Sequence, residues 1–437
     1  MVRMEEDGAE LRVTPWQMSW VVASVELGDL LSPLPAAYLS DRWGRKIVMM
    51  SVGPLCLMSW LLVVVTRSVE VLYVVRTVQG LAVGIVYTVA PIYIAEVSHP
   101  KIRGQLSGQF LTMWYVGVVY AYSLGPYLSY DAYAYVCAAI PVLFLLTYAV
   151  APETPYYYVM VQRWDDAEKS LKWLRAKDDV RDELESIRES VAEEMKMKNC
   201  GALSAWKELV KDKASRKSLV VVQLVCCVKY LLGMPAVISY STYTFAQTSS
   251  GLIGADELTI GMGLLLCVST FLAAYVVDRV GRRPLLLAST AGCLVFSSLV
   301  GLYYFLEGVL HLQVAPYAWL MYLSVAGYCV LWCIGLGPIL QTIQAEYFPT
   351  STRGLAGGLA AITGTLTTFV VLKVYQTVES AYGVYMNFWM YAFFAFLGTV
   401  SLSFVLRETA GRTLGQIQEE MKNGVKPSSN GLPETAP

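Results

Sequence analysis

The stretch DRWGRK at residues 41–46 returns as DRVGRR at residues 278–283, and each copy directly follows a long apolar block. Each copy places an acid and a basic cluster in a turn too short for any other structure. A second matched pair lies further along the chain. Glu96 precedes Arg103 by seven residues, and Glu346 precedes Arg353 by the same seven. This repetition predicts two related halves, each with charged side chains gathered at one surface of the fold.

The chain outside these turns is strongly apolar. Of its 437 residues, 56% are hydrophobic and 15% are charged, whereas soluble proteins carry about 25% charged residues. The apolar residues fall into eleven blocks, each near the roughly 20 residues that a helix needs to cross a bilayer. Helices are expected because lipid cannot satisfy free backbone groups. The predicted spans are 16–40, 47–66, 71–97, 106–126, 132–151, 218–245, 258–277, 284–306, 315–345, 355–377 and 384–406.

Lysine and arginine are distributed unequally between the two sets of loops. One set carries a basic cluster at most of its turns and includes the 152–217 stretch and the tail. In the other set, Arg67 is the only strong cation. Because basic loops stay in the cytosol, the basic set is predicted to be cytosolic. The first span then runs inward from an acidic outer N-terminus, and the span count is odd. A membrane protein built from two repeats should have matched halves, so we expect that a first helix is missing from this sequence.

These patterns divide the chain into five parts. A polar segment covers 1–15, a bundle of five spans covers 16–151, and a bundle of six spans covers 218–406. Residues 152–217 alternate in charge sign and carry an apolar stripe, so amphipathic helices on the cytosolic side are expected. The tail 407–437 is predicted to be cytosolic with a disordered end that is rich in Pro, Ser and Gly. The stripe consists of Leu171, Trp173, Leu174, Leu184 and Ile187.

Further motifs resemble those of the sugar transporter family of the major facilitator superfamily, over nearly the whole chain. They are Arg76-x3-Gly80-x3-Gly84, Pro91-x-Tyr93-x2-Glu96, Pro152-Glu153-Thr154-Pro155, Gly335-x-Gly337-Pro338, Glu346-x-Phe348-Pro349 and Glu408-Thr409-x-Gly411-Arg412. The stretches PETPYYYV and SLKWLR are most similar to those of arthropod facilitated trehalose transporters and their relatives. The resemblance implies an all-α membrane protein with two helix bundles around a central cavity. It implies twelve helices, of which eleven spans are present here.

The charged repeat is predicted to act as a lock at the cytosolic side. Charges at that depth are partly desolvated, so they pair across neighbouring helix ends and can stabilise one conformation. The alternative is a static anchor at the cytosolic surface, and the two-fold repetition of four matching pieces favours the lock. The predicted lock residues are Asp41, Arg42, Arg45, Glu96, Arg103, Asp278, Arg279, Arg282, Glu346 and Arg353.

The positions that contact sugar in the family carry fewer polar side chains here. By the same resemblance, the usual Gln-Gln-x-Ser-Gly-x-Asn run is replaced by residues 229–235. Most of the family's hexose-binding set is therefore absent from this sequence. The polar residues that remain as candidate contacts for a hydroxylated solute are Arg76, Lys229, Tyr230, Tyr240, Gln341, Gln344 and Lys373.

Lys229 is the least expected of these candidates. It lies about 12 residues, or roughly 18 Å, into a spanning helix, where a charge is costly and a partner is expected. Glu26 and Asp29 lie three residues apart on one helical face and are the predicted charge partners. A structural pair, a contact to the substrate and a role in proton coupling all stay open. Pro235 is expected to mark a break in the same helix.

The sequence predicts a carrier that moves a small hydroxylated solute, a sugar of the trehalose or hexose class, by facilitated alternating access. No GxxxxGK[ST] loop is present, so transport driven by ATP is not expected. No catalytic constellation is visible, so the chain is predicted not to be an enzyme. Two alternatives stay open. One is a carrier of another small solute, for example an anion, and the other is a non-transporting solute sensor of the same fold.

The remaining features restrict cofactors and partners. Nine scattered cysteines and two histidines predict no metal site, and no other cofactor is expected. The lipid bilayer and a small-molecule solute are the expected partners, and no nucleic acid is expected. The plasma membrane is the location that the resemblance implies, and the oligomeric state is left open.

Overall fold

The computed structural model describes residues 13–66, 68–99, 102–199, 202–248, 253–348, 350–409 and 416, and within this part every regular element is a helix. The first group is α2 (Pro15–Leu31), α3 (Pro33–Trp43), α4 (Arg45–Val65), α5 (Val69–Val97), α6 (Arg103–Leu124) and α7 (Tyr130–Tyr148). Short helices follow as α8 (Pro155–Met160), α9 (Trp164–Arg175), α10 (Arg181–Asn199) and α11 (Ala202–Lys211). The last group is α12 (Lys213–Leu231), α13 (Met234–Ala246), α14 (Ala255–Val280), α15 (Arg282–Gly308), η1 (Ala315–Tyr317), α16 (Ala318–Leu331), the π-helix η2 (Trp332–Leu336), α17 (Gly337–Tyr347), α18 (Thr350–Tyr382) and α19 (Val384–Val405).

Helices cover all eleven predicted spans. Within the described residues, nine helical stretches are long and apolar enough to cross a membrane. The predicted spans 16–40 and 106–126 are not among the nine. The first is divided into α2 and α3, and the second is α6, which opens with the polar run RGQLSGQ. The sequence-based count of eleven is therefore approximate. Residues 1–12 lie outside the described part, so the expectation of a missing first helix stays a prediction.

The first described helix starts and breaks where its sequence dictates. Thr14 accepts a hydrogen bond from the amide of Gln17, and the Gln17 side chain accepts one from the amide of Thr14 at 2.9 Å. This capping box satisfies free amides, and Pro15 follows at the first helical position. The helix then breaks at Ser32, because Pro33 has no amide hydrogen to continue the ladder.

Two of the C-terminal helices are also interrupted. The break between α12 and α13 falls at Leu232 and Gly233, with Pro235 in the first turn of α13, which confirms the predicted break. The second interruption is η2, whose wider turn separates α16 from α17. Such π-helical turns free backbone groups from the regular ladder and are frequent at functional sites.

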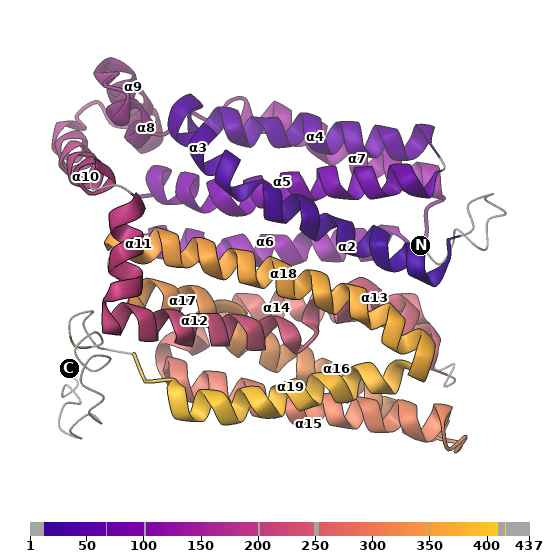
Figure 1. Ribbon diagram of the computed structural model, residues 1–437. Coiled ribbons are helices and arrows are strands. Elements are labelled where there is room, and N and C mark those ends of the chain that lie inside the picture. Colours follow the sequence, from indigo (N-terminus) through magenta and orange to yellow (C-terminus); the bar gives the residue numbers. More distant parts are fainter. Residues whose placement is uncertain are drawn as a thin grey trace.

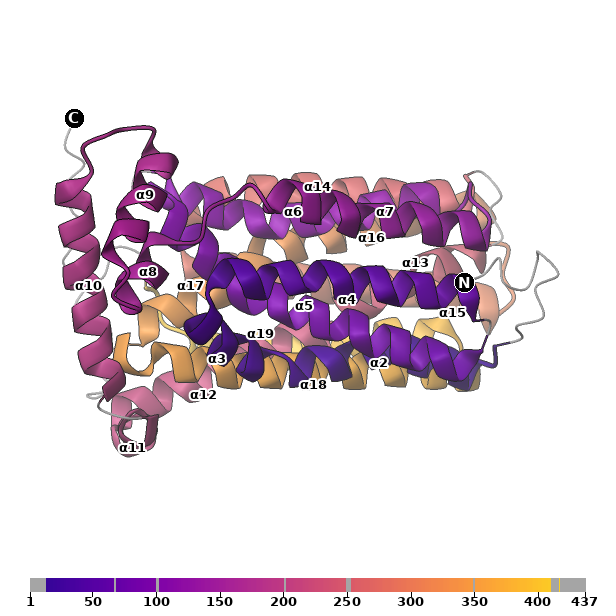
Figure 2. The same ribbon diagram turned by 90° about the horizontal axis from the view of Figure 1, so that it is seen from above.

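The long helices lie side by side in two layers (Figure 1). In one layer α2 packs along α5, and α4 packs against both α5 and α7. In the other layer α15 packs along α19 and α16, and α12 packs on α18. Two helix pairs join the layers, because α2 lies along α18 and α6 lies along α14. Both views show α2 beside α18 (Figure 2).

The short helices α8 to α11 gather at one end of the bundle (Figure 2). The helices α8 to α10 have a small apolar core of their own, which confirms the predicted stripe at Leu171 and Ile187. Leu184 packs against this core, and Leu174 is half-buried. The prediction was wrong for Trp173, which is 59% exposed. Trp173 is two residues from Leu171 on the same helix, so its side chain points away from the buried face.

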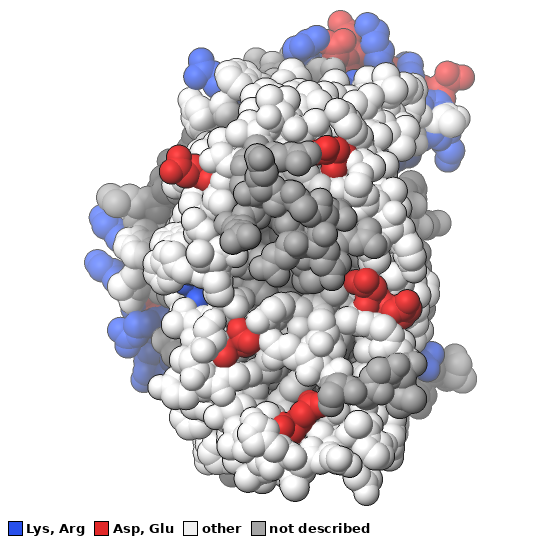
Figure 3. Space-filling view, turned by 90° about the vertical axis from the view of Figure 1, so that its right-hand side faces the viewer, with Lys and Arg blue, Asp and Glu red and all other residues white. Residues whose placement is uncertain are grey.

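The turn between α3 and α4, directly before Arg45, lies at the same end as α8 to α11, and we call this the basic end (Figure 1). The opposite end shows several acidic patches, while Lys and Arg are visible mainly at its margins (Figure 3). The three-dimensional charge distribution thus follows the unequal loop charges of the sequence, with the basic end predicted to face the cytosol.

Candidate transport site

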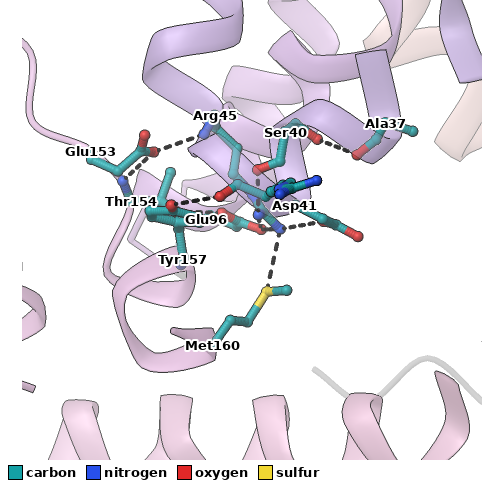
Figure 4. Close-up of polar contacts among 10 residues, drawn as sticks. Ala37, Ser40, Asp41, Arg45, Glu96, Glu153, Thr154, Tyr157 and Met160 are labelled. Atoms are coloured by element: carbon teal, nitrogen blue, oxygen red, sulfur yellow. Dashed lines mark hydrogen bonds and ion pairs between the residues drawn. The ribbon is translucent and has the colours of Figure 1, made fainter. Parts of the chain in front are cut away.

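Arg45 is the centre of a charged network at the basic end (Figure 4). It begins α4, and its side chain is 4% exposed. Its Nη2 lies 3.1 Å from Glu96 Oε1 and 3.4 Å from Asp41 Oδ1. Its Nη1 donates to the Ser40 carbonyl at 3.1 Å. A guanidinium this buried is tolerated because two carboxylates and a carbonyl pair with it.

Glu153 fixes the start of α4 from the loop that follows α7. Its Oε1 accepts the Arg45 amide at 3.1 Å, and its Oε2 accepts the Lys46 amide at 2.9 Å. A carboxylate there satisfies free amides of the first turn and interacts favourably with the helix dipole. Burial raises the pKa of the Glu153 carboxyl, and these backbone hydrogen bonds and the Arg45 charge act in the opposite direction. The fit requires glycine before Arg45, because Gly44 has a φ of 100° and a Cβ there would lie 2.1 Å from Glu153 Oε2.

The same arrangement recurs at the start of α15. Arg282 Nη2 lies 3.1 Å from Glu346 Oε1. Glu408 accepts the backbone amides of Arg282 and Arg283, each at 3.0 Å. The preceding glycine, Gly281, has a φ of 93°, which matches the glycine of the first network. The repeat predicted from sequence therefore corresponds to two matching sets of contacts.

The two networks differ in how completely they close. In the first, Thr154 Oγ1 donates to Glu96 Oε2 at 2.6 Å. In the second, Thr409 Oγ1 and Glu346 Oε2 are buried, and neither has a hydrogen-bond partner among the described residues. Within the described residues, the second network therefore lacks a counterpart of the hydrogen bond from Thr154 to Glu96.

Glu153 and Glu408 were not among the predicted lock residues. A signal for them is present in the sequence, since a Glu-Thr pair follows the last span of each half, at 153–154 and 408–409. A carboxylate just beyond a span lies at the membrane surface, where it can reach the free amides of a neighbouring helix start.

The other predicted lock residues lie at the edge of these networks or cannot be placed. Arg42 donates to a tyrosine hydroxyl at 3.2 Å. Arg353 donates twice to a main-chain carbonyl five residues earlier, at 3.2 and 3.3 Å, and does not contact Glu346. Arg279 is exposed. The side chains of Arg103 and Asp278 lie outside the described residues.

Lys229 connects the two interrupted helices of the C-terminal layer. Its side chain is buried, and its Nζ donates to the Gly337 carbonyl at 2.9 Å, where η2 meets α17. Trp332 of η2 donates back to the Lys229 carbonyl at 3.2 Å. The amine also lies over the rings of Tyr230 and Trp332, at 5.4 and 5.6 Å. Aromatic faces and a carbonyl thus stabilise the amine in place of a carboxylate.

The predicted charge partners of Lys229 are therefore corrected. The structure records no ion pair between Lys229 and either Glu26 or Asp29. Asp29 Oδ2 instead accepts the hydroxyl of Thr365 on α18, at 2.8 Å. The physical reason is the π-helical turn, which leaves a carbonyl free to accept from the amine. In a regular helix that carbonyl would point along the helix axis and accept from the next turn.

Replacing Lys229 with methionine should change the free energy of unfolding by at most about 2 kcal/mol, because a lost hydrogen bond to a charged group is offset by a smaller desolvation cost. Uptake of a neutral sugar should persist. Thermal unfolding in detergent and uptake into proteoliposomes measure the two quantities. A Trp332→Phe variant, which removes the reciprocal donor, is the matched control. Complete loss of uptake at an unchanged melting temperature would contradict this structural role.

The remaining candidate contacts do not converge. Tyr240 is buried, with its ring stacked on Tyr375 at 4.5 Å and its hydroxyl donating to a carbonyl of α18. Arg76 donates to the Gln side chain three residues later on α5, at 3.2 Å. Gln341 is exposed and Gln344 is half-buried, both on α17. The contacts described for these side chains do not join them to one another.

Lys373 lies where the two layers meet near the opposite end. Its Nζ is 3.8 Å from the ring centre of Trp16 and 4.0 Å from that of Trp20, and it donates to Ser19 Oγ at 2.8 Å. These three partners belong to the first turns of α2, whereas Lys373 belongs to α18. We call this group the outer clamp. On the other side of the bundle, the hydroxyl of Tyr122 on α6 donates to a carbonyl of α13 at 2.6 Å.

A family model described as "Sugar (and other) transporter" matches residues 4–421. The chain belongs to the sugar transporter family. The facilitated trehalose transporter Tret1 of Bombyx mori is 30% identical to it over 414 residues, which are 95% of this chain and 81% of that protein. The protein of the same name from Aedes aegypti is 29% identical over 419 residues. That match covers 96% of this chain, which spans about half (51%) of the length of the Aedes protein.

Solved structures establish the fold of the transporter. The inward open conformation of the xylose transporter XylE from E. coli aligns with a TM-score of 0.76 at 19% identity, over 95% of this chain and 92% of that one. XylE, a proton:xylose symporter of the major facilitator superfamily, bound to 6-bromo-6-deoxy-D-glucose aligns with a TM-score of 0.71 at 21% identity, over 96% and 94%. The predicted major facilitator fold is confirmed. The transporter is an integral, multi-pass membrane protein of a family of carriers, not of enzymes.

Proposed function

We propose that the transporter moves trehalose or a hexose across the plasma membrane by facilitated alternating access, with its basic end in the cytosol. The observation that carries this proposal is the pair of matched networks around Arg45 and Arg282, in a chain that belongs to the sugar transporter family. The relatives named as facilitated trehalose transporters support the substrate class.

The networks suit a carrier whose two layers move as rigid bodies. Glu153 and Glu408 each tie the start of one helix to the segment that follows the last span of the same half. Buried charges that pair within one half resist local unfolding when the surface between the halves opens to water. The networks therefore hold each half together while the contacts between α2 and α18 and between α6 and α14 rearrange.

The outer clamp supplies the contact that must break for the other conformation. Lys373 over two indole rings is an attraction of about 1–2 kcal/mol when partly desolvated, small enough to be broken and remade during each cycle. The contact from Tyr122 to α13 lies across the bundle from it. Together, the outer clamp and the Tyr122 contact support a conformation that is closed at the end opposite the basic end.

The comparisons give no support to the alternatives of an anion carrier or a non-transporting sensor. The structure also removes one argument for an anion carrier, because the Lys229 amine donates to a carbonyl within the protein.

Purified full-length protein in proteoliposomes should take up labelled trehalose or D-glucose with saturable kinetics. Uptake should not require a proton gradient, because the proposed transport is facilitated. L-glucose and protein-free liposomes are the controls, and an exposed-site variant, Lys172→Met, should behave as the parent because its pair with Glu168 is solvent-exposed. If neither trehalose nor D-glucose enters the proteoliposomes, the proposed function is wrong.

A further inference from the structure

Two acidic residues, Glu26 and Asp29, lie in the last two turns of α2, where this helix packs along α18 of the other layer. Glu26 and Asp29 share one face of α2, and each is only partly buried. The α2 backbone approaches α5 closely here, because Gly80 leaves no side chain between them. A Cβ on Gly80 would lie 1.9 Å from the Val25 carbonyl oxygen. Such close approach between small residues is typical of membrane helices and fixes the position of the acids.

Groups from both layers lie near these acids. Asp29 Oδ2 accepts the Thr365 hydroxyl of α18 at 2.8 Å. The hydroxyls of Tyr87 on α5 and Tyr230 on α12 lie within electrostatic range of both carboxylates. The ring of Tyr230 lies against α18 at Gly364, directly before Thr365. Both halves therefore contribute polar groups to one place near the midplane.

Two polar side chains at this place, Ser32 and Glu26, have no hydrogen-bond partner among the described residues. Ser32 is 4% exposed, and its Oγ has no partner among the described residues. Its Oγ and Asp29 Oδ1 flank the same point, at 2.0 and 2.9 Å from where a Cβ on Gly84 would lie. Glu26 accepts no hydrogen bond from a described residue. A buried polar group without a partner is costly, so this arrangement is suited to a ligand that brings hydrogen-bonding groups.

The two amines of the candidate list are engaged elsewhere. Lys229 donates to the Gly337 carbonyl, and Lys373 belongs to the outer clamp. No ion pair to Glu26 or Asp29 is recorded in the described part of the chain. Neither carboxyl group is paired with a cation of the described residues, which distinguishes this place from an anion site.

We infer that Glu26 and Asp29 form the hydrogen-bond acceptors of the solute site and set its charge selectivity, an inference that rests on the proposed function. A neutral polyhydroxylated solute donates its hydroxyls to both carboxylates, while the Tyr87, Tyr230 and Thr365 hydroxyls complete the site. Carboxylates accept stronger hydrogen bonds from hydroxyl groups than neutral acceptors do. An anionic sugar is repelled because like charges in a partly desolvated site strongly disfavour one another.

Uptake of D-glucose, glucuronate and glucosamine into proteoliposomes tests this inference. The full-length parent is compared with Glu26→Gln, Asp29→Asn and the double variant. Glu257→Gln, an acid at the exposed start of α14, is the matched control. The parent should carry glucose and reject glucuronate. The double variant should raise KM for glucose by about tenfold or more, since hydrogen bonds to charged groups are lost. Its discrimination against glucuronate should fall by about tenfold or more.

The outcomes separate this inference from the proposed function. If the parent carries no sugar, the proposed function fails. If the parent carries glucose and the double variant keeps both its KM and its rejection of glucuronate, the acids are not the site. A change in the pH profile alone would assign the acids to protons and overturn the inference, and a parent that prefers glucosamine would overturn selection of neutral solutes. A glucose-dependent shift in melting temperature, measured in detergent, reports binding for a variant that folds without transporting.

Discussion

Replacing Arg45 with methionine should abolish transport and lower the free energy of unfolding by about 3 kcal/mol or more, because Glu96 is left buried without its counter-charge. Methionine keeps an apolar stem of similar length beside Tyr157 and Met160, so the charge is the main loss. The start of α4 should also loosen, because the positive charge of Arg45 that stabilises the carboxylate of Glu153 is lost. Thermal unfolding in detergent and uptake into proteoliposomes measure these effects.

Two further arginine variants calibrate this result. Arg188 pairs with Glu185 at 3.5 Å on α10, but both side chains are about 60% exposed, so Arg188→Met should cost less than about 1 kcal/mol. Arg282→Met should fall between the two, because the Arg282 side chain is 15% exposed, compared with 4% for Arg45. Equal destabilisation by Arg45→Met and Arg188→Met would show that burial of the first network is not what matters.

Replacing Gly80 with alanine should separate α2 from α5, with a cost of about 1–3 kcal/mol or more from overpacking. The added Cβ would meet backbone atoms of Val25 and Asp29, which cannot rotate away as a flexible side chain could. Uptake should fall strongly because Asp29 moves with α2. The melting temperature and the rate of uptake are the measurements.

Gly117 provides the matched control for this substitution. It lies within α6, and a Cβ there would meet nothing within 4 Å. Gly117→Ala should therefore be neutral or stabilise by up to about 1 kcal/mol through helix propensity. The two alanine variants should have effects of opposite sign or of very different size. A similar effect of both would mean that helix propensity, and not the contact between α2 and α5, decides the outcome.

The fold could be predicted from sequence because its determinants are local. Block length and loop charge are read directly along the chain, and they predict helices, their ends and the basic end. The breaks are partly local as well, since Pro33 and Pro235 mark two of them. Pro338 likewise follows the π-helix at Trp332–Leu336, in the first turn of α17, but it does not predict that the interruption is a π-helical turn.

The candidate site could be predicted only in part, for a related reason. Arg45 and Glu96 were predicted to belong to one lock because their spacing repeats in the chain, and the structure pairs them directly. The partner of Lys229 depends on which carbonyl a distant π-helical turn exposes, which no spacing in the sequence reports. Glu26 and Asp29 were assigned to Lys229 because opposite charges at similar depth are expected to pair. Asp29 instead accepts a hydrogen bond from Thr365, which is 336 residues away in the sequence.

Counterflow of trehalose is the measurement that tests the central claim most directly. Proteoliposomes containing the full chain are loaded with unlabelled trehalose and diluted into a trace of labelled trehalose. An alternating-access carrier exchanges one molecule for another, so labelled sugar should accumulate transiently above its equilibrium level, and Arg45→Met should show no such rise. Labelled trehalose or D-glucose that only equilibrates slowly, or does not enter under the same conditions, would contradict the account of this chain as a sugar carrier.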